Sequence, residues 1–393
     1  MSRLNQVLAV TSTALRGVPS RCGTSLVVVI GVAAVVAVLV CALAVASSFR
    51  TAAAKTGSPL RAIVLNGDTE ADSGFSRENA VAILNAAGVK SGPGARVVGS
   101  AEALVFVSLV DQHSGLNAYT TIRGVGDQLL RLRPELHLVE GRLFKRGAHE
   151  VIVGRAVQSR LGGLQLGSAI TLPNGDWTIV GVFESGGDSH ESEVLADAET
   201  LLNTYHRNQF NSVTVALRDP RDFESFSAAL SADPTLSVKA HREPEYFGTM
   251  TRSVSELLVA IAYGIGGIMA LGAVFSALNT MYSAVSTRAV EIGTLRAIGF
   301  SATPVVVSVM AEAVMLGLIG AAIGSGIAWL LLNGTTMSAM TGVTPSQLTF
   351  HLSVGPAQML IGSAFAAVIV IIGGLLAAFR AARLPVAAAL RMS

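Results

Sequence analysis

The chain has 393 residues, of which 51% are hydrophobic and only 14% are charged, and its net charge is +2. This overall charge is uninformative about nucleic acid, which is not among the expected partners. The length leaves room for a membrane bundle and one or two small extramembrane subdomains, and it excludes a third large domain.

Four apolar stretches are each long enough to cross a bilayer as a helix, which takes roughly 20 residues. They cover residues 25–46, 257–285, 304–332 and 354–379. We interpret the first stretch as an uncleaved anchor, because its apolar core is longer than that of a signal peptide. Residues 1–24 ahead of it are expected to form an amphipathic leader in the inner interface, with a disordered polar leader as the alternative.

Basic residues predict the orientation of the bundle. The chain has 28 basic and 26 acidic residues. Residues 47–256 contain 20 of the basic and 24 of the acidic ones, which leaves 8 basic and 2 acidic residues elsewhere. The positive-inside rule therefore places both termini, the 286–303 loop and the 380–393 tail in the cytoplasm, and residues 47–256 and 333–353 outside. We expect a multi-pass protein of the plasma (inner) membrane, a four-helix bundle in a 1+3 arrangement.

Residues 47–256 alternate β-like and helical patterns, which predicts a large α+β extracytoplasmic domain of two lobes between the first and second spans. Strands are expected at 60–65, 103–110, 118–122, 150–153, 169–172, 177–183, 212–217 and 236–240. Helices are expected at 77–87, 155–161, 197–206 and 220–230. From Pro244 the pattern stays helical into the second span, so we predict a continuous stalk through which a motion of the domain would move the bundle directly.

Motifs for nucleotide or metal chemistry are absent from the sequence. All four lysines follow residues other than glycine, so there is no P-loop, and we do not expect an enzyme that hydrolyses ATP itself. Asp188, His190, Glu191 and Glu193 form a loose cluster that could bind a cation. Because they follow a glycine pair, a solvated loop tip is the favoured interpretation. No catalytic residue and no metal ligand are assigned.

Glu312 lies eight residues into the third span, where an ionised carboxylate costs about 3 kcal/mol or more unless it is paired. The candidate partners are Asn279, Thr280 and Ser283 on the second span, or a helix of a second copy. Two interpretations stay open. In the first, Glu312 and Asn279 form a polar latch between helices, and the hydrogen-bond partner in the latch changes with the conformational state of the protein. In the second, Glu312 is protonated and hydrogen-bonded and only fixes the packing of the helices.

Small residues are expected to form the contact faces of the spans. Gly320 and Gly324 make a Gly-x-x-x-Gly motif, and Gly317 precedes it by one turn. Residues 313–379 contain no Asp, Glu, Lys or Arg, so the spans lack the polar lining of a hydrophilic translocation path. Nothing in these spans resembles a water-filled channel.

The 286–303 loop is predicted to contain a short amphipathic helix between two spans. Gly299 is placed to end it, and Thr303 with Pro304 provides an N-cap and a first-turn proline for the next span. Such a helix must either lie on the bilayer or dock into a groove of a partner.

Residues 288–299, with the sequence Arg-x-x-Glu-Ile-Gly-x-Leu-Arg-Ala-Ile-Gly, and the following Glu312-Ala313 and Gly317 to Gly324 resemble the FtsX-like ABC permease family. This family includes macrolide-exporter and lipoprotein-releasing permeases. The tail at 382–391 is similar to its usual ending. Segments 140–144, 150–154 and 180–183 resemble its MacB-like periplasmic core domain.

The resemblance implies a permease that pairs with a second copy or a paralogue and binds a separate ABC ATPase, expected in two copies, which holds the ATP and Mg²⁺. This chain would need no cofactor of its own. Because only 24 residues precede the first span, the ATPase is expected on another chain. The ATPase-docking residues implied are Arg288, Glu291, Ile292, Gly293, Leu295 and Arg296.

The implied mechanism is mechanotransmission, in which ATP-driven motion moves the external domain to export or extract an amphipathic substrate: a lipid, lipoprotein, peptide or hydrophobic drug. Membrane lipids and a periplasmic adaptor are further candidate partners. The alternative is a transmembrane signalling protein that regulates a cell-wall hydrolase or a sensor kinase without moving cargo.

Overall fold

The computed structural model describes residues 22–111, 115–172, 174–287, 294, 302–340 and 347–383. The chain divides into two compact units. The helical unit comprises the described residues up to Ala46, residues 257–335 and the described residues from Leu352 onward. The sheet unit comprises residues 47–256 and the described part of 336–351.

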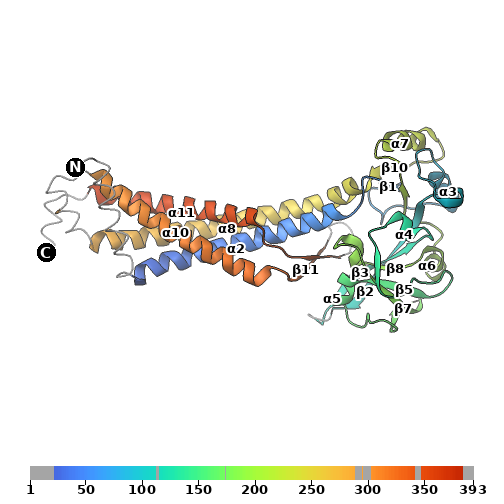
Figure 1. Cartoon of the computed structure of the whole chain (residues 1–393), viewed down its shortest axis with the longest axis horizontal. Helices are drawn as coiled ribbons and strands as arrows, with labels where there is room; N and C mark the ends of the chain where they lie inside the picture. Colours follow the sequence, from blue (N-terminus) through green and yellow to red (C-terminus); the bar gives the residue numbers. More distant parts are fainter. Residues whose placement is uncertain are drawn as a thin grey trace. The chain divides into compact units, whose positions relative to one another are not determined.

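Four long helices build the helical unit: α2 (Cys22–Lys55), α8 (Glu243–Thr287), α10 (Ala302–Leu332) and α11 (Pro356–Arg383). In this unit they run alongside one another (Figure 1). Each contains a segment long and apolar enough to cross a membrane, at Ser25–Lys55, Glu243–Ser283, Val306–Leu332 and Pro356–Leu375. The four predicted spans thus correspond to four long apolar helices, and the predicted continuity of the second span with its stalk is confirmed in α8.

Spacing along α2 explains how the helices pack. Val28, Val32, Val36 and Val40 recur every four residues, which places them in one stripe along the helix, and all four are buried. They belong to a core with buried side chains from the three other helices, namely Met281, Val309, Ala313, Leu316, Ala321, Ala328, Ala366, Val370 and Ala378.

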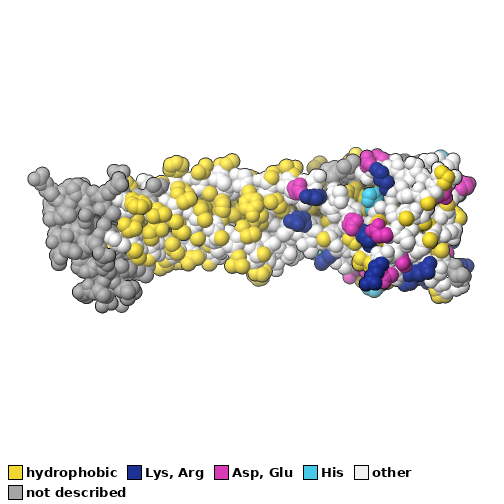
Figure 2. Space-filling model, turned by 90° about the horizontal axis from the view of Figure 1, so that it is seen from above, with side chains coloured by type: hydrophobic (Ala, Val, Ile, Leu, Met, Phe, Trp, Pro, Cys, Tyr) yellow, Lys and Arg dark blue, Asp and Glu magenta, His cyan; other side chains and the backbone are white. Residues whose placement is uncertain are grey.

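Apolar side chains also cover the outside of the helices. Figure 2 shows hydrophobic side chains over the visible face of the helical unit and charged ones gathered on the sheet unit. On α8, Ile268 is 74% and Phe275 is 69% exposed. A large exposed apolar surface of this kind is typical of a protein that contacts lipid.

The sheet unit is built on one sheet with the strand order β10-β1-β9-β2-β3-β8-β5-β7-β4, and β6 pairs with β7. The strands are β1 (Arg61–Leu65), β2 (Gly99–Val110), β3 (Asn117–Val125), β4 (His137–Gly141), β5 (Glu150–Gly154), β6 (Ala169–Leu172), β7 (Gly175–Glu184), β8 (Val194–Asp197), β9 (Ser212–Ala216) and β10 (Lys239–Arg242).

The long strand β2 joins two halves of this sheet. Its first residues, Gly99 to Glu102, pair with β9, and its remainder, from Ala103 to Val110, pairs with β3. All ten strands belong to one sheet, so the division of this unit into two lobes stays a prediction. The helices of the unit are α3 (Arg77–Leu84), α4 (Leu129–Leu132), α5 (Arg155–Arg160), α6 (Ala198–Thr204) and α7 (Asp222–Ala232), with 3-10 turns η2 (Pro93–Ala95) and η3 (Ser189–Ser192).

The predicted α+β pattern is confirmed, and the structure adds elements that the pattern did not reveal. Strands β4 and β8 and helix α4 were not expected, and the strand expected at 236–240, β10, begins at Lys239. Between α10 and α11, where a connecting loop was expected, strands β11 (Thr336–Met340) and β12 (Gln347–His351) form an antiparallel pair.

Candidate functional site at the helix junction of the sheet unit

The short turn η3 contacts two chain segments that continue into the helical unit. Directly after α2, Thr56 donates its hydroxyl to Ser189 Oγ at 2.8 Å, and the Ser189 amide donates back to Thr56 Oγ1 at 2.8 Å. From β12, the Thr349 amide donates to Ser192 Oγ at 2.8 Å. One turn of four residues therefore holds both the end of α2 and the β11–β12 pair.

The start of α8 packs on the same turn. Its Phe247 ring meets the buried His190 ring edge-on, with 5.6 Å between the ring centroids. Tyr246 and Phe247 are buried against Ile63 and Leu65 of β1, and the Tyr246 hydroxyl accepts a hydrogen bond from the Glu70 amide at 3.1 Å. We call this meeting point of α2, α8, β12 and η3 the helix junction.

A glycine just after α2 allows the chain to pass close to α8 at this junction. Gly57 follows Thr56 and has φ +101°, a backbone conformation that favours glycine. A Cβ on Gly57 would lie 2.9 Å from the backbone nitrogen of Pro244, in the first turn of α8. The chain leaving α2 therefore passes directly against the start of α8, and no larger residue fits there.

Behind the junction lies a network of three arginines and five glutamates, which we call the charge network. Its members are Arg61, Arg123, Arg133, Glu70, Glu102, Glu135, Glu193 and Glu243. All are buried apart from the half-buried Glu135. They come from β1, the loop after β1, β2, β3, the α4 region, the end of η3 and the first residue of α8.

Arg123 on β3 is the centre of the network. Its Nη1 donates to Glu70 Oε1 at 2.7 Å and to Glu102 Oε2 at 2.8 Å, while its Nε and Nη2 donate to the two carboxylate oxygens of Glu193 at 2.8 Å each. Only 3% of this arginine is exposed. One guanidinium thus ties three carboxylates from different parts of the fold.

The other two arginines bring α8 into the network. Arg133 Nη1 donates to Glu102 Oε1 at 2.7 Å, and its Nη2 reaches Glu243 Oε1 at 3.5 Å. Arg61 Nε donates to Glu243, whose carboxylate also accepts from the Ser58 amide at 3.0 Å. Because Glu243 is the first residue of α8, the helix begins on a fixed charged anchor.

The network lowers the pKa of two of its carboxyl groups, Glu193 and Glu102, despite their burial. Burial favours the neutral form of Glu193, but the charge and hydrogen bonds of Arg123 outweigh it and hold the pKa of that carboxyl well below its usual range. The pKa of Glu102 is likewise lowered against burial, by Arg133 and Arg123. A carboxylate that lost its arginine here would be a buried, uncompensated charge, which is strongly destabilising.

The prediction of a solvated tip at residues 188–193 is wrong. Asp188, His190, Glu191 and Glu193 are all buried. Asp188 caps η3 by accepting from the Glu191 amide at 3.2 Å, and burial raises the pKa of its carboxyl. The glycine pair before the cluster suggested exposure, but the adjoining turn folds inward. Among the described residues no group of three His, Cys, Asp or Glu side chains could hold a metal ion.

Sequence reasoning missed the charge network, although a signal was present. Arg61, Glu102 and Arg123 each stand inside a strand next to apolar residues. A charged residue in such a position is almost never fully buried unless it is paired. Several of them in different strands of one domain therefore suggest partners for one another.

The sequence-predicted site residues fall in three places. The ATPase-docking residues Arg288, Glu291, Ile292, Gly293, Leu295 and Arg296 lie outside the described residues. Glu312 on α10 is buried, with 5% exposed, whereas Asn279 on α8 is exposed. A latch between Glu312 and Asn279 stays a prediction.

The three glycines of α10 that were predicted to pack, Gly317, Gly320 and Gly324, lie at close helix contacts. A Cβ on Gly317 would meet the side chain of Val370 on α11 at 2.7 Å, and a Cβ on Gly320 would lie 2.9 Å from the carbonyl oxygen of Val29 on α2. At Gly324 a Cβ would overlap the carbonyl oxygen of Ala33. Two turns of α10 therefore approach the α2 backbone directly.

Comparison with known proteins identifies both parts of the chain. Residues 23–233 match the model of the MacB-like periplasmic core domain, and residues 263–386 match that of the FtsX-like permease C-terminal part. The Macrolide export ATP-binding/permease protein MacB of Burkholderia pseudomallei is 25% identical over 274 residues, which cover 65% of this chain and 41% of that protein.

A Probable export ATP-binding/permease protein of Pseudomonas fluorescens is 24% identical over 282 residues, covering 65% of this chain and 42% of that protein. The chain thus spans about two fifths of the length of these curated relatives. Among solved structures, the periplasmic region of MacB from Actinobacillus actinomycetemcomitans matches with a TM-score of 0.38 and 14% identity, over 51% of this chain and 94% of that one.

Proposed function

Because this chain belongs to the family of ABC transporter permeases that join a MacB-like periplasmic core domain to an FtsX-like C-terminal part, we propose that it is the membrane subunit of an exporter powered by a partner ATPase. Its sheet unit lies outside the inner membrane, and both termini lie in the cytoplasm. It works as a pair with a second copy or a paralogue, and it exports or extracts an amphipathic substrate by mechanotransmission.

The observation that carries this proposal is the anchoring of α8. The helix is continuous over 45 residues, which is about 67 Å at 1.5 Å per residue, more than twice the length needed to cross a bilayer. Its first residue, Glu243, is held by Arg61 and Arg133. A continuous helix that is fixed in the charge network at one end can pass a push at its other end to the sheet unit.

Docking of the ATPase is assigned to the 286–303 loop, which directly follows α8 in the chain. The sequence itself has no P-loop, so the nucleotide is held by the partner. ATP binding closes the two ATPase copies, the loops and α8 shift, and the sheet units move a substrate that is already outside the inner membrane. The lack of charged residues in 313–379 supports a path that avoids the bundle interior.

The test is a double charge reversal in the loop, Arg288→Glu with Glu291→Arg, in the full-length chain purified from membranes of its own host. We expect the co-purified ABC ATPase to be lost, as measured by quantitative mass spectrometry. The matched control is Arg252→Glu with Glu256→Arg, which reverses an exposed i,i+4 pair on α8 and should keep the ATPase. Co-purification at full yield in the loop variant would refute the docking assignment.

The same purification separates export from the signalling alternative, in which the motion regulates a cell-wall hydrolase or a sensor kinase. A bound amphiphile or a periplasmic adaptor in the wild-type sample supports export. A hydrolase or kinase that is lost together with the ATPase supports signalling.

A further inference from the structure

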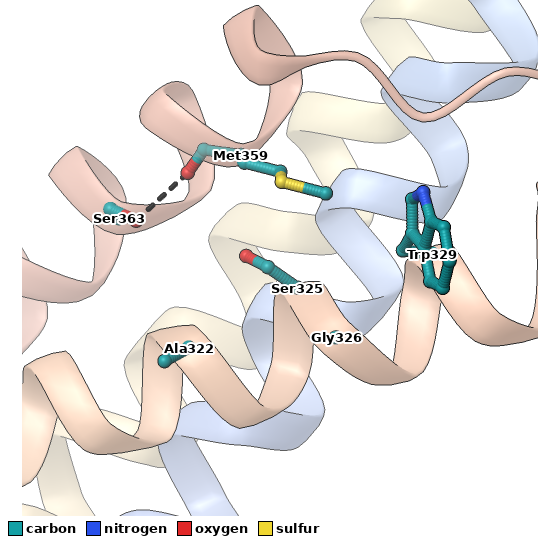
Figure 3. Close-up of a pocket in the computed structure, with 6 residues that line it drawn as sticks. All are labelled: Ala322, Ser325, Gly326, Trp329, Met359 and Ser363. Atoms are coloured by element: carbon teal, nitrogen blue, oxygen red, sulfur yellow. Dashed lines mark hydrogen bonds between the residues drawn. The ribbon is translucent and has the colours of Figure 1, made fainter.

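A shallow cavity of about 410 Å³, open along much of its surface, lies between α10 and α11 in the helical unit. Figure 3 shows the residues that line it: Ala322, Ser325, Gly326 and Trp329 from α10, and Met359 and Ser363 from α11. The wall is mostly apolar, with two serine hydroxyls on facing helices.

The two hydroxyls differ in their hydrogen bonds. Ser363 Oγ donates to the carbonyl oxygen of Met359, four residues earlier in α11, at 2.8 Å, which is a common arrangement for serine in a helix. Ser325 Oγ has no hydrogen-bond partner, although Ser325 is only 7% exposed. Figure 3 shows this hydroxyl pointing from α10 toward α11. A buried unpaired hydroxyl is costly, so this donor is available for a ligand.

The cavity lies close to one end of the bundle. Trp329 is one turn nearer the C-terminal end of α10 than Ser325, and Met359 and Ser363 lie in the first two turns of α11. Trp329 is 47% exposed, and tryptophan side chains are enriched at the level of the lipid headgroups. Ser325 therefore lies about 6 Å deeper in the bilayer than Trp329, whose residue type is typical of the headgroup level.

We propose that this cavity binds an acyl chain of a membrane phospholipid and that Ser325 Oγ donates a hydrogen bond to the ester carbonyl of that chain. The apolar wall fits methylene groups, and the depth fits an ester carbonyl just below the headgroup. No charged residue occurs in 313–379, so the cavity offers no ion pair to a phosphate and recognises the ester instead. This inference goes beyond the proposed function and does not depend on ATP.

The test measures quenching of Trp329 fluorescence by phosphatidylcholine with dibrominated chains, with the full-length chain reconstituted in phosphatidylcholine vesicles. Ester-linked and ether-linked brominated lipids are compared, since the ether lacks the carbonyl. We expect the wild type to prefer the ester-linked lipid by about three- to tenfold, the effect of one hydrogen bond. Trp329→Phe identifies the quenched signal, because the chain's other tryptophan, Trp177, is fully buried in the sheet unit.

Two variants address the binding site directly. Ser325→Ala should abolish the preference for the ester, while the matched variant Ser363→Ala, whose hydroxyl is already paired within its helix, should keep it. Gly326→Leu should lower quenching by both lipids, because a Cβ there meets no atom within 4 Å and the added side chain enters the cavity. Gly267→Leu on α8, also in open space, should leave quenching unchanged.

Equal quenching by both lipids in the wild type, or wild-type quenching in both Ser325→Ala and Gly326→Leu, would mean contact with bulk lipid only and would overturn the proposal. The measurement contains no ATPase. Its failure therefore leaves the proposed export function intact, and loss of ATPase docking leaves the lipid site intact.

Discussion

The sheet unit and the helical unit are held together by different physical means. The sheet unit buries a network of arginines and glutamates next to its apolar core, whereas among the described residues of the helical unit Glu312 is the one buried charged side chain. In the helical unit, glycines of α10 meet the α2 backbone instead. In water, apolar burial supplies the driving force and paired charges can specify geometry; in lipid, close packing must supply the attraction itself.

The largest effect on stability is expected when the central arginine of the charge network, Arg123, is removed. Arg123→Met leaves Glu70, Glu102 and Glu193 buried with fewer partners, and we expect a loss of about 3–5 kcal/mol in the free energy of unfolding. Chemical denaturation of the purified full-length chain in detergent measures this change.

The control for this variant is Arg142→Met, which removes a bidentate pair with Glu150 on the surface, where Arg142 is 48% exposed. Solvent screens such a pair, so its loss should hardly change the unfolding free energy. Equal effects in both variants would show that burial does not distinguish the network from surface ion pairs.

The helical unit is tested by adding volume at a glycine contact. Gly324→Leu places a side chain against the carbonyl of Ala33, and we expect α10 and α2 to separate at a cost of about 1–3 kcal/mol. Gly326→Leu, two residues along, enters open space and should retain the wild-type thermal midpoint. If both variants melt alike, glycine contacts are not what holds the bundle together.

A smaller effect should appear in the acid stability of the sheet unit. The folded pKa values of Glu102 and Glu193 lie below 4.5, the usual value, so the unfolded chain takes up protons first as the pH falls. The network therefore contributes fully above about pH 4.5, and its contribution declines below that pH as the folded pKa values are approached. Unfolding midpoints measured from pH 7 to pH 3 follow this loss.

Glu193→Gln should flatten this decline because it removes one of the titrating groups. Glu224→Gln, at a carboxyl whose side chain is 82% exposed, should keep the full decline. If the unfolding midpoint of Glu193→Gln fell with pH as steeply as that of the wild type, the acid sensitivity would arise outside the charge network.

Much of the architecture could be predicted from the sequence because it depends on local periodicity. Apolar runs longer than 20 residues predicted the four long helices, and an unbroken helical pattern after Pro244 predicted α8. Alternating strands predicted the α+β unit, but the four-residue strand β8 is too short to show a period, and the pair β11–β12 has no typical hairpin signal among its described residues.

The sequence by itself determined the spans, the stalk and the family, since each is encoded in consecutive residues. Only the tertiary structure decided the charge network, the burial of residues 188–193 and the unpaired hydroxyl of Ser325. Arg123 is separated along the chain from Glu102 by 21 residues, from Glu70 by 53 and from Glu193 by 70. Whether such charges are solvated or paired depends on strand order and register across the sheet, and these long-range pairings leave no periodic trace in the residues themselves.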